Sequence, residues 1–298
     1  MKVAVTGSSG LIGTALVAAL RADGHEVIRL VRAAPAAADA ITWDPRADGG
    51  GLDPRSLDGV AAVEHLAGAG LADKRWTPGY QAEIRDSRVQ GTKALAGVLA
   101  AMTTPPGVLI SQSAIGWYGD TGGREVTESD PAGRGFLPEV VRDWEAAAGE
   151  AASAGIRVVT LRSGIVLSRR GGMLGRLLPL FRLGLGGRLG SGRQMMSWIG
   201  LPDWVAAARF LLGRADITGP VNMTSPNPVS NAEFTAALAH AVHRPAVMLV
   251  PVPALKLAVG GVSSDILSSA RVMPKRLLGE GFGFQHAGIA GALAAELG

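Results

Sequence analysis

Three glycines near the start of the chain constrain its fold more than any other feature. Gly7, Gly10 and Gly13 follow the apolar run 3–5 at the spacing G-x-x-G-x-x-G, and they open a stretch, 11–20, with small and apolar side chains on one helical face. This order predicts a strand, a tight turn and a helix, the first unit of a parallel α/β sheet. Strand-to-helix turns are glycine-rich for steric reasons alone, so the context decides whether the loop also binds a ligand.

Strand-like and helix-like segments then alternate through the first half of the chain. Residues 25–31, 61–68 and 106–114 read as strands, because short apolar runs are bounded by turn residues. A helical pattern covers residues 89–101, and a second one at 139–155 leads into a strand pattern that ends at residue 167. Strands that alternate with helices predict an α/β fold with a doubly wound parallel sheet of the Rossmann type.

The rhythm changes after residue 167, because segment 169–194 is rich in glycine and arginine and strand signals become rare. We therefore predict a core over residues 1–166 and a smaller lobe over residues 167–298, interleaved with the core. The later elements that we expect are strands at 219–225 and 246–253, the second of them buried and followed by a loop. We also expect helices at 231–242, capped by Ser230 or Asn231, and at 274–284.

Composition excludes several classes of function. The formal charge is +4, the arginines form no run of five or more, and aromatic residues make up only 5% of the chain, so we expect no nucleic-acid partner. The absence of cysteine excludes disulfides and thiolate chemistry. His240 and His243 stand near a helix end without a third ligand at metal-binding spacing, so no metal site is expected.

The sequence contains no clear signal peptide and no clear membrane-spanning segment. The apolar run 3–5 is too short for the core of a signal peptide. The apolar segment 246–261 is interrupted by Pro251, Pro253 and Lys256 and falls short of a membrane span. We expect a cytoplasmic protein with no membrane partner, and the sequence leaves the oligomeric state open.

The position of the glycine loop favours a dinucleotide ligand over a purely steric role. Because the loop follows the first strand and opens a helix, its backbone N–H groups would point at a pyrophosphate. Gly7 would allow the tight turn, Gly10 the close approach of the phosphate, and Gly13 the packing of helix on strand. Residues 1–166 are thus predicted to bind a dinucleotide. We expect a small-molecule substrate, for which an anion is one candidate, to bind between this core and the Gly/Arg-rich lobe.

The end of the second predicted strand indicates which dinucleotide is bound. Proteins that bind NAD usually place a carboxylate there for the ribose 2′-hydroxyl, but this strand ends in "RLVR", and Glu26 stands at its beginning. The guanidinium of Arg32 can form a charge-assisted pair with a 2′-phosphate. We therefore expect NADP(H) rather than NAD(H); the alternative is that Arg32 only solvates the surface.

Longer motifs resemble those of a known family. "VTGSSGLIGTALV", "HLAG" and "SQSAIGWYGD" resemble the extended short-chain dehydrogenase/reductase superfamily. With "LRSGIVLSRRGGML", "GLGGRLGSGRQMMSWIGLPD" and "ILSSARVMPKRLLGEGFGF", the chain is similar nearly end to end to the atypical nucleoside-diphosphate-sugar epimerase-like family, whose members carry a short characteristic C-terminal domain. Besides the loop glycines and Arg32, the resemblance implies cofactor contacts from Ser9, Leu11, Ile12, Leu66, Ala67, Gly68, Ser111 and Gly164.

The resemblance also exposes a departure at the expected active site. In this superfamily a tyrosine, helped by a lysine four residues later, exchanges a proton with the substrate while the nicotinamide exchanges a hydride. Here Tyr80 is followed by Ile84 and Tyr118 by Gly122, and the stretch before "RDWE" reads "FLPEVV". The usual proton-transfer pair is therefore absent from this chain.

Three other residues are candidates for the proton transfer. In relatives the catalytic serine stands four residues before the tyrosine; that position is Ala114 here, and Ser113 is its neighbour. Tyr118 either donates the proton or forms a wall of the pocket. Asp143 and Glu145 stand two residues apart on a predicted helix, so at most one faces the cleft, and Glu145 is the candidate. We name Ser113 and Tyr118 as candidate catalytic residues.

Candidate substrate contacts come from two later segments. Gln194, Ser197 and Trp198 are expected in a loop just before a helix that begins near Pro202, a region with which related epimerases grip nucleotide or sugar. Arg162, at the end of a strand, is expected either to contact the substrate or to anchor the following loop through a salt bridge.

Two functions follow from these observations. The first is an NADP(H)-dependent epimerase- or reductase-like enzyme with an atypical active site, acting on an unidentified substrate such as a nucleotide sugar. The second is a sensor or scaffold protein that binds NADP(H) but has weak or no catalysis. The missing tyrosine–lysine pair is what keeps the second hypothesis open.

Overall fold

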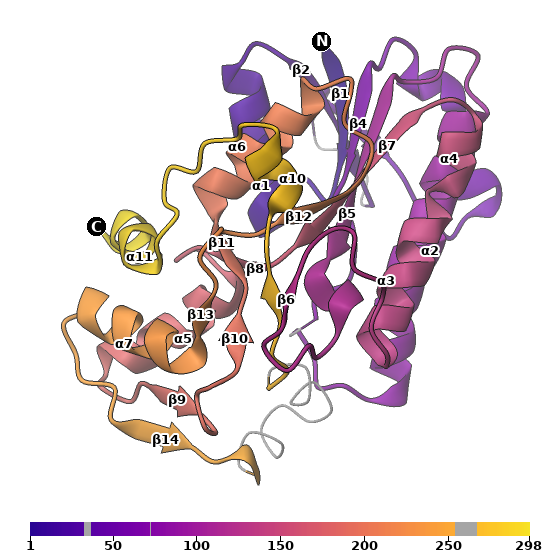
Figure 1. The fold of residues 1–298 in the computed structure, drawn as a ribbon. Helices are drawn as coiled ribbons and strands as arrows, with labels where there is room; N and C mark the ends of the chain where they lie inside the picture. The colour runs from indigo at the N-terminus through magenta and orange to yellow at the C-terminus, as the bar shows by residue number, and fades with distance from the viewer. Residues whose placement is uncertain (33–36, 72, 254–266) are drawn as a thin grey trace.

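A seven-stranded parallel β-sheet forms the centre of the molecule. The computed structural model describes residues 1–32, 37–71, 73–253 and 267–298, and its strands lie in the order β12-β7-β5-β4-β1-β2-β3 (Figure 1). Every neighbouring pair in this sheet is parallel, which confirms the doubly wound α/β fold. The strands are β1 (Lys2–Thr6), β2 (Glu26–Val31), β3 (Ala40–Thr42), β4 (Ala62–His65), β5 (Val108–Ala114), β7 (Arg157–Ser163) and β12 (Gly219–Met223).

The order of the strands reverses between β1 and β4. From β1 the chain runs outward to β2 and β3 on one side, and β4, β5, β7 and β12 then follow on the other. In open α/β sheets the crevice for a ligand lies at such a point, outside the carboxyl ends of the strands. The glycine loop after β1 and the segment after β4 meet at this crevice.

Helices cover both faces of the sheet (Figure 1). On one face, α1 (Leu11–Ala22) and α6 (Leu201–Leu212) pack on Val3, Val5 and Ile110. On the other face, α2 (Pro78–Ala100), α3 (Phe136–Ala147) and α4 (Gly149–Ser153) complete the second layer, where Leu95 and Leu99 pack on Val63 and Leu109. Both faces of the sheet are therefore buried, as the apolar strand sequences require.

Capping residues define where two of the helices begin. Thr77 accepts a hydrogen bond from the backbone N–H of Tyr80, and Pro78 occupies the first turn, so α2 begins well before the residues 89–101 that the apolar pattern predicts. At α7 (Asn231–Ala241), Ser230 and Glu233 form a capping box. Of the two caps considered for this helix, Ser230 is therefore the one that the structure uses.

The second half of the chain builds a smaller lobe and also returns to the sheet. Strand β12 pairs with β7, and α6 packs on α1, so residues 201–223 belong to the main sheet layers although they follow residue 167. Leu174, Phe181 and Phe234 lie in the separate core of the lobe. The remaining elements of the lobe are β8 (Ile165–Leu167), α5 (Gly172–Arg182), β9 (Gly187–Leu189), β10 (Met195–Met196), β11 (Trp198–Gly200), β13 (Val229–Ser230), β14 (Met248–Val250) and α11 (Ile289–Leu297).

Two expectations for this lobe are wrong. The stretch 194–198, expected as a loop, contributes strands, because β10 pairs with β13 and β11 pairs with β8. The strand expected at 246–253 forms as β14, but it is not buried: Met248 is 49% exposed and Leu249 is 50% exposed. It pairs with β9, and both of these side chains remain about half exposed to solvent. The loop expected beyond residue 253 lies largely outside the described residues.

Short elements connect the lobe to the core. Strand β15 (Arg271–Val272) pairs with β6 (Glu125–Val126), and α10 (Lys275–Gly279) follows directly. The 3₁₀ turns are η1 (Asp48–Gly51), η2 (Pro54–Leu57) and η3 (Ile115–Tyr118). Among the helices that the structure describes, none combines the length and the apolar character needed to cross a bilayer.

Candidate functional site

The loop between β1 and α1 requires glycine at two positions for packing alone. Gly7 has φ +65°, and a Cβ there would lie 2.7 Å from the carbonyl carbon of Leu66. A Cβ on Gly13 would lie 2.2 Å from the carbonyl oxygen of Gly7. Any side chain at either position would push the helix or the segment after β4 away from the loop.

The third glycine faces open space. A Cβ on Gly10 would meet only the carbonyl oxygen of Gly7 within 4 Å, at 3.3 Å, and both Ser9 and Gly10 are exposed. Gly10 caps α1 without a side-chain hydrogen bond, and the first turn of α1 has no acidic residue. The N–H groups of Leu11, Ile12 and Gly13 have no acceptor within the helix, so this end attracts an anion.

A dinucleotide phosphate fits this loop. The hydroxyl of Ser8 is buried inside the loop without a hydrogen-bond partner, and the helix N-terminus beside it lacks a protein cap. Buried polar groups are rarely left unpaired in a native protein. A phosphate oxygen bound next to Gly10 would accept hydrogen bonds from the free backbone N–H groups in the first turn of α1.

The segment after β4 is fixed by a buried hydrogen-bond network. The backbone N–H groups of Leu66 and Ala67 donate to Thr6 Oγ1 at 3.0 and 3.1 Å. Nδ1 of His65 lies 2.8 Å from the same oxygen, and Nε2 lies 3.0 Å from Thr92 Oγ1. Trp144 Nε1 also donates to that Thr92 oxygen at 2.8 Å. The network thus joins β1, β4, α2 and α3 beneath the crevice.

These contacts assign one tautomer to His65. Both lone pairs of Thr6 Oγ1 accept backbone N–H groups, so its proton points at Nδ1 and His65 carries its own proton on Nε2. Burial lowers the pKa of His65 to about 4. The ring is therefore neutral at pH 7, and it holds residues 66–67 in place through Thr6.

Glu64, the residue before His65, points to the opposite face of the sheet. Its two carboxyl oxygens are buried without hydrogen-bond partners, and burial raises its pKa well above the ordinary value. Burial therefore favours the neutral form of the Glu64 side chain. It lies away from the residues around His65 and takes no part in the candidate site.

Arg32 lies at the end of β2, as the sequence predicts. It is exposed directly after β2, and no carboxylate within the described ranges pairs with it. The nearby Asp39 is already engaged, because Arg29 donates to it at 2.8 and 2.9 Å and Arg21 also contacts it. The guanidinium of Arg32 is thus free to meet an anion.

A second cluster lies at the ends of β5 and β7. Ser113 Oγ donates to Glu145 Oε1 at 2.6 Å. Arg162 holds the same carboxylate with two bonds, Nε to Oε1 at 2.8 Å and Nη2 to Oε2 at 2.9 Å. The side chains of Arg162 and Glu145 are only 3% and 13% exposed. We call these three residues the Ser113–Glu145–Arg162 cluster.

The side chains of Asp143 and Glu145 on α3 point in different directions, as the sequence predicts. Asp143 pairs with Arg85 at the surface, whereas Glu145 turns inward. The first two turns of α3 read "FLPEVV", without a tyrosine or a lysine. The inward carboxylate therefore comes from a later turn of the same helix.

Tyr118 lies beside this cluster but its hydroxyl is fully engaged. The hydroxyl donates to Asn222 Oδ1 at 2.7 Å and accepts from Arg162 Nη1 at 3.2 Å. The residue is 3% exposed, and burial raises the pKa of the phenol to about 12. Trp117 stacks on the guanidinium of Arg162 at 3.8 Å. The tyrosine thus forms part of the wall that holds Arg162.

The remaining predicted residues separate into two groups. Ser111 is buried in the same row of the sheet as His65, and Gly164 packs so tightly that a Cβ would lie 2.6 Å from the carbonyl oxygen of Ser197. Both are at the crevice end of the sheet. Gln194 and Trp198 lie in the lobe: Gln194 Nε2 donates to the Leu189 carbonyl, and Trp198 is fully buried. The structure does not bring these two together with the cluster.

Several residues of the site carry no clear signal in the sequence. Asn222 donates through Nδ2 to the carbonyl of Met273, and its backbone N–H donates to Glu128 Oε1. A polar residue inside the strand-like "GPVNMTS" is the only hint of this role. Thr92 lies within the range 89–101, whose pattern predicts a helix and nothing more, and Arg88 lies just before that range.

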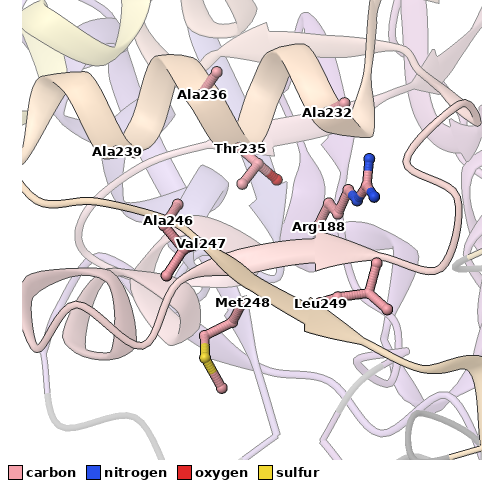
Figure 2. A pocket seen from close by; sticks show the side chains of 9 residues that line it. All are labelled: Arg188, Ala232, Thr235, Ala236, Ala239, Ala246, Val247, Met248 and Leu249. Carbon is pink, nitrogen blue, oxygen red and sulfur yellow. The ribbon is translucent and has the colours of Figure 1, made fainter.

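A separate groove of about 470 Å³ lies on the lobe between α7 and the β9–β14 pair (Figure 2). Ala232, Ala236 and Ala239 line the helical side, and Arg188 and Thr235 supply polar side chains, while Met248 points away from α7. None of the residues predicted to bind the cofactor or the substrate lines it. Across the described parts of the chain, no three His, Asp or Glu side chains gather as metal ligands would.

Comparison with known proteins places this geometry in a family. Residues 3–223 match the model of the NAD dependent epimerase/dehydratase family, and residues 250–296 match a domain of unknown function, DUF1731. The chain is 47% identical to Epimerase family protein Mb2239 of Mycobacterium bovis, over 98% of this chain and 96% of that protein. It is 34% identical to Epimerase family protein SDR39U1 of Bos taurus, over 98% of both chains.

A solved structure is similar over the whole molecule. The crystal structure of human epimerase family protein SDR39U1 (isoform 2) with NADPH superposes with a TM-score of 0.92 at 32% identity and covers 100% of this chain and 99% of that one. The resemblance drawn from the sequence motifs, to an atypical extended dehydrogenase/reductase with its own C-terminal domain, is therefore confirmed. The chain belongs to the NAD dependent epimerase/dehydratase family.

Proposed function

We propose that this protein is an NADP(H)-dependent epimerase- or reductase-like enzyme in which Glu145, rather than a tyrosine–lysine pair, exchanges the proton. The observation that carries the proposal is the bidentate hold of Arg162 on Glu145, with Ser113 as a third donor. It supplies a fixed, partly exposed carboxylate where the family's usual acid is absent. The substrate class that we propose is a small molecule bearing a hydroxyl or carbonyl group, such as a nucleotide sugar.

The cofactor part of the proposal rests on the glycine loop and Arg32. The N–H groups at the start of α1 would bind the pyrophosphate, with Gly10 leaving room for it. The exposed guanidinium of Arg32 would bind a 2′-phosphate. The similar human protein was solved with NADPH, which supports the preference. When bound, the nicotinamide would accept or supply the hydride.

The geometry of the cluster indicates which oxygen moves the proton. Glu145 Oε1 accepts from both Ser113 and Arg162, so its two lone pairs are used, while Oε2 accepts only from Arg162. Oε2 therefore keeps a free lone pair for the substrate hydroxyl. As the alcohol carbon loses its hydride, Glu145 would take the hydroxyl proton, and it would return that proton in the reverse reaction.

Ser113 and Tyr118 would then position groups rather than move the proton. Ser113 is 1% exposed and orients the carboxylate by donating to it. Tyr118 orients Arg162, and a phenol whose pKa is raised to about 12 is a poor acid at pH 7. A modest rate of turnover is expected, because this arrangement lacks the lysine that activates the usual tyrosine.

The test combines cofactor titration with a turnover screen. NADPH fluorescence should report binding, and oxidation of NADPH should then be followed with carbonyl compounds and nucleotide sugars. Glu145→Gln should lower kcat by about 100-fold or more with unchanged NADPH affinity, and Tyr118→Phe by less than about 100-fold. Thermal melts establish that each variant folds. Loss of activity in Tyr118→Phe with retention in Glu145→Gln would make the tyrosine the proton donor and overturn this assignment.

One observation favours the second function, a sensor or scaffold that binds NADP(H) with little catalysis. The first two turns of α3 read "FLPEVV", without a tyrosine or a lysine, and the hydroxyl of Tyr118 beside the cluster is engaged. Tight NADPH binding without turnover of any carbonyl or nucleotide sugar would support this alternative.

A further inference from the structure

Arg88 is a partly buried cation beside the segment that follows β4. Its side chain runs along Gly68: a Cβ at that glycine would lie 3.7 Å from Arg88 Cγ and 3.8 Å from Cζ and Nη1. The guanidinium carbon lies 5.1 Å from the centre of the Trp144 ring. Gly68 itself is exposed and has no side chain with which to cover the guanidinium.

The guanidinium of Arg88 is poorly satisfied. It makes one hydrogen bond, from Nη1 to the carbonyl of Ile84 at 3.0 Å, although a guanidinium carries five donors. Within ranges 1–32, 37–71, 73–253 and 267–298, no carboxylate lies at ion-pair distance from it. Burial lowers its pKa to about 10, which leaves it charged at pH 7.

Two other arginines that are buried or partly buried show which partners the Arg88 guanidinium is missing. Arg162 has the two oxygens of Glu145, and Arg157 donates to the carbonyls of Leu211, Leu212 and Ile217. A charge removed from water without such partners is costly. Arg88 therefore carries an unmatched positive charge at a position where a ligand could compensate it.

The position of Arg88 places this charge at the candidate site. Thr92, four residues later on α2, contacts His65 at the end of β4. Because α2 runs antiparallel to the strands, Arg88 lies one turn closer to the carboxyl edge of the sheet. It thus approaches segment 66–68 from the same sheet face as Glu145, whose neighbour Trp144 contacts both Arg88 and Thr92.

We infer that Arg88 binds an oxyanion of the substrate, a phosphate or a carboxylate, at the edge of the crevice beside Gly68. Two N–H groups of a guanidinium match two oxygens of either group, and such pairs are strong where water is partly excluded. This inference rests on the proposed function, because it places the anion beside the bound cofactor. It also narrows the substrate to a compound with an anionic group near the reacting carbon.

The experiment uses the full chain saturated with NADPH and two probes, inorganic phosphate and acetate. Broadening of the ³¹P resonance of phosphate and of the ¹H resonance of acetate reports their binding. In Arg88→Gln the broadening by at least one probe should fall fivefold or more. Arg85→Gln is the matched control, since Arg85 lies on the same helix but is paired with Asp143 at the surface, and it should broaden both probes as the unchanged protein does.

Each outcome has a defined meaning. Broadening that depends on Arg88 supports the inference, and the more strongly broadened probe identifies the group. Equal broadening in Arg88→Gln and Arg85→Gln overturns it, as does a tenfold loss of NADPH affinity in Arg88→Gln, which would make Arg88 a cofactor contact. NADPH titration of the unchanged chain is read first, so failure of the proposed function appears as absent NADPH binding, separately from these results.

Discussion

The glycine loop and the Ser113–Glu145–Arg162 cluster lie at the same edge of one sheet, yet they are built in opposite ways. The loop works because side chains are absent: Gly7 and Gly13 allow contacts that a Cβ would prevent, and Gly10 leaves space. The cluster works because side chains from β5, α3 and β7 meet in charged hydrogen bonds. Backbone recognition is thus local in the sequence, whereas side-chain chemistry is assembled from distant segments.

The largest effect is expected at Gly13. Gly13→Val places a branched side chain against the Gly7 carbonyl, 2.2 Å from the new Cβ, and should destabilise the fold by more than about 4 kcal/mol or prevent folding. Urea unfolding followed by circular dichroism measures this. A soluble variant with unchanged stability would break the view that the loop is fixed by backbone contacts.

The second largest effect is expected when Arg162, the cation of the cluster, is replaced. Arg162→Met leaves Glu145 without its partner in a site where that side chain is 13% exposed, and should cost about 3 to 4 kcal/mol in the free energy of unfolding. The double variant Arg162→Met/Glu145→Leu removes both charges and should recover much of this loss. If the double variant is no more stable than the single one, the pair does not act as a unit.

His65 stands between the two regions and should make stability depend on pH. Its pKa falls from 6.5 in the unfolded chain to about 4 in the folded protein, so the unfolded state binds more protons in this window. The free energy of unfolding should therefore drop by about 3 kcal/mol as the pH falls from 6.5 to 4. His65→Asn removes this contribution, and parallel pH dependences of the two proteins would contradict the prediction.

A substitution at Gly10 should weaken cofactor binding without destabilising the fold. Gly10→Val keeps a backbone with φ −74° that any residue can adopt, but its side chain occupies the space proposed for the phosphate. NADPH affinity should fall about 100-fold, equivalent to about 2.7 kcal/mol, with little change in the melting temperature. Fluorescence titration measures the affinity, and retained binding would place the phosphate elsewhere.

The smallest effect is expected at Arg32. Arg32→Ala should weaken NADPH about tenfold, or about 1.4 kcal/mol, and leave NADH affinity unchanged, because only NADPH carries the 2′-phosphate. Calorimetric titration of both cofactors provides the comparison. Equal losses for the two would show that Arg32 does not distinguish them.

The contrast between the two regions also explains what the sequence could predict. The order of strand, glycine loop and helix is encoded within residues 2–22, and the alternating apolar runs predict the parallel sheet. The strand pairings of β10 and β11 could not be predicted, because these strands are short and pair with β13 and β8. Helix α5 could not be predicted either, because it lies in a segment that is rich in glycine and arginine.

The candidate site, too, could be predicted only where its features are local in the sequence. A two-residue spacing predicts that Asp143 and Glu145 diverge, but only the packing of α3 on the sheet decides that Glu145 faces Ser113 and Arg162. The partner of Tyr118, Asn222, is more than a hundred residues away in the sequence. Nothing in the pattern around Arg88 indicates that none of the described carboxylates pairs with it.

The connection between β6 and β15 has a consequence for biosynthesis. A polypeptide leaves the ribosome from its N-terminus, so the sheet up to β12 is made before residues 269–276. Until that segment arrives, Asn222 Nδ2 lacks the Met273 carbonyl, and Glu128 Oε1 lacks the N–H of Arg276. The wall around Tyr118 and Arg162 is therefore among the last parts of the protein to be completed during translation.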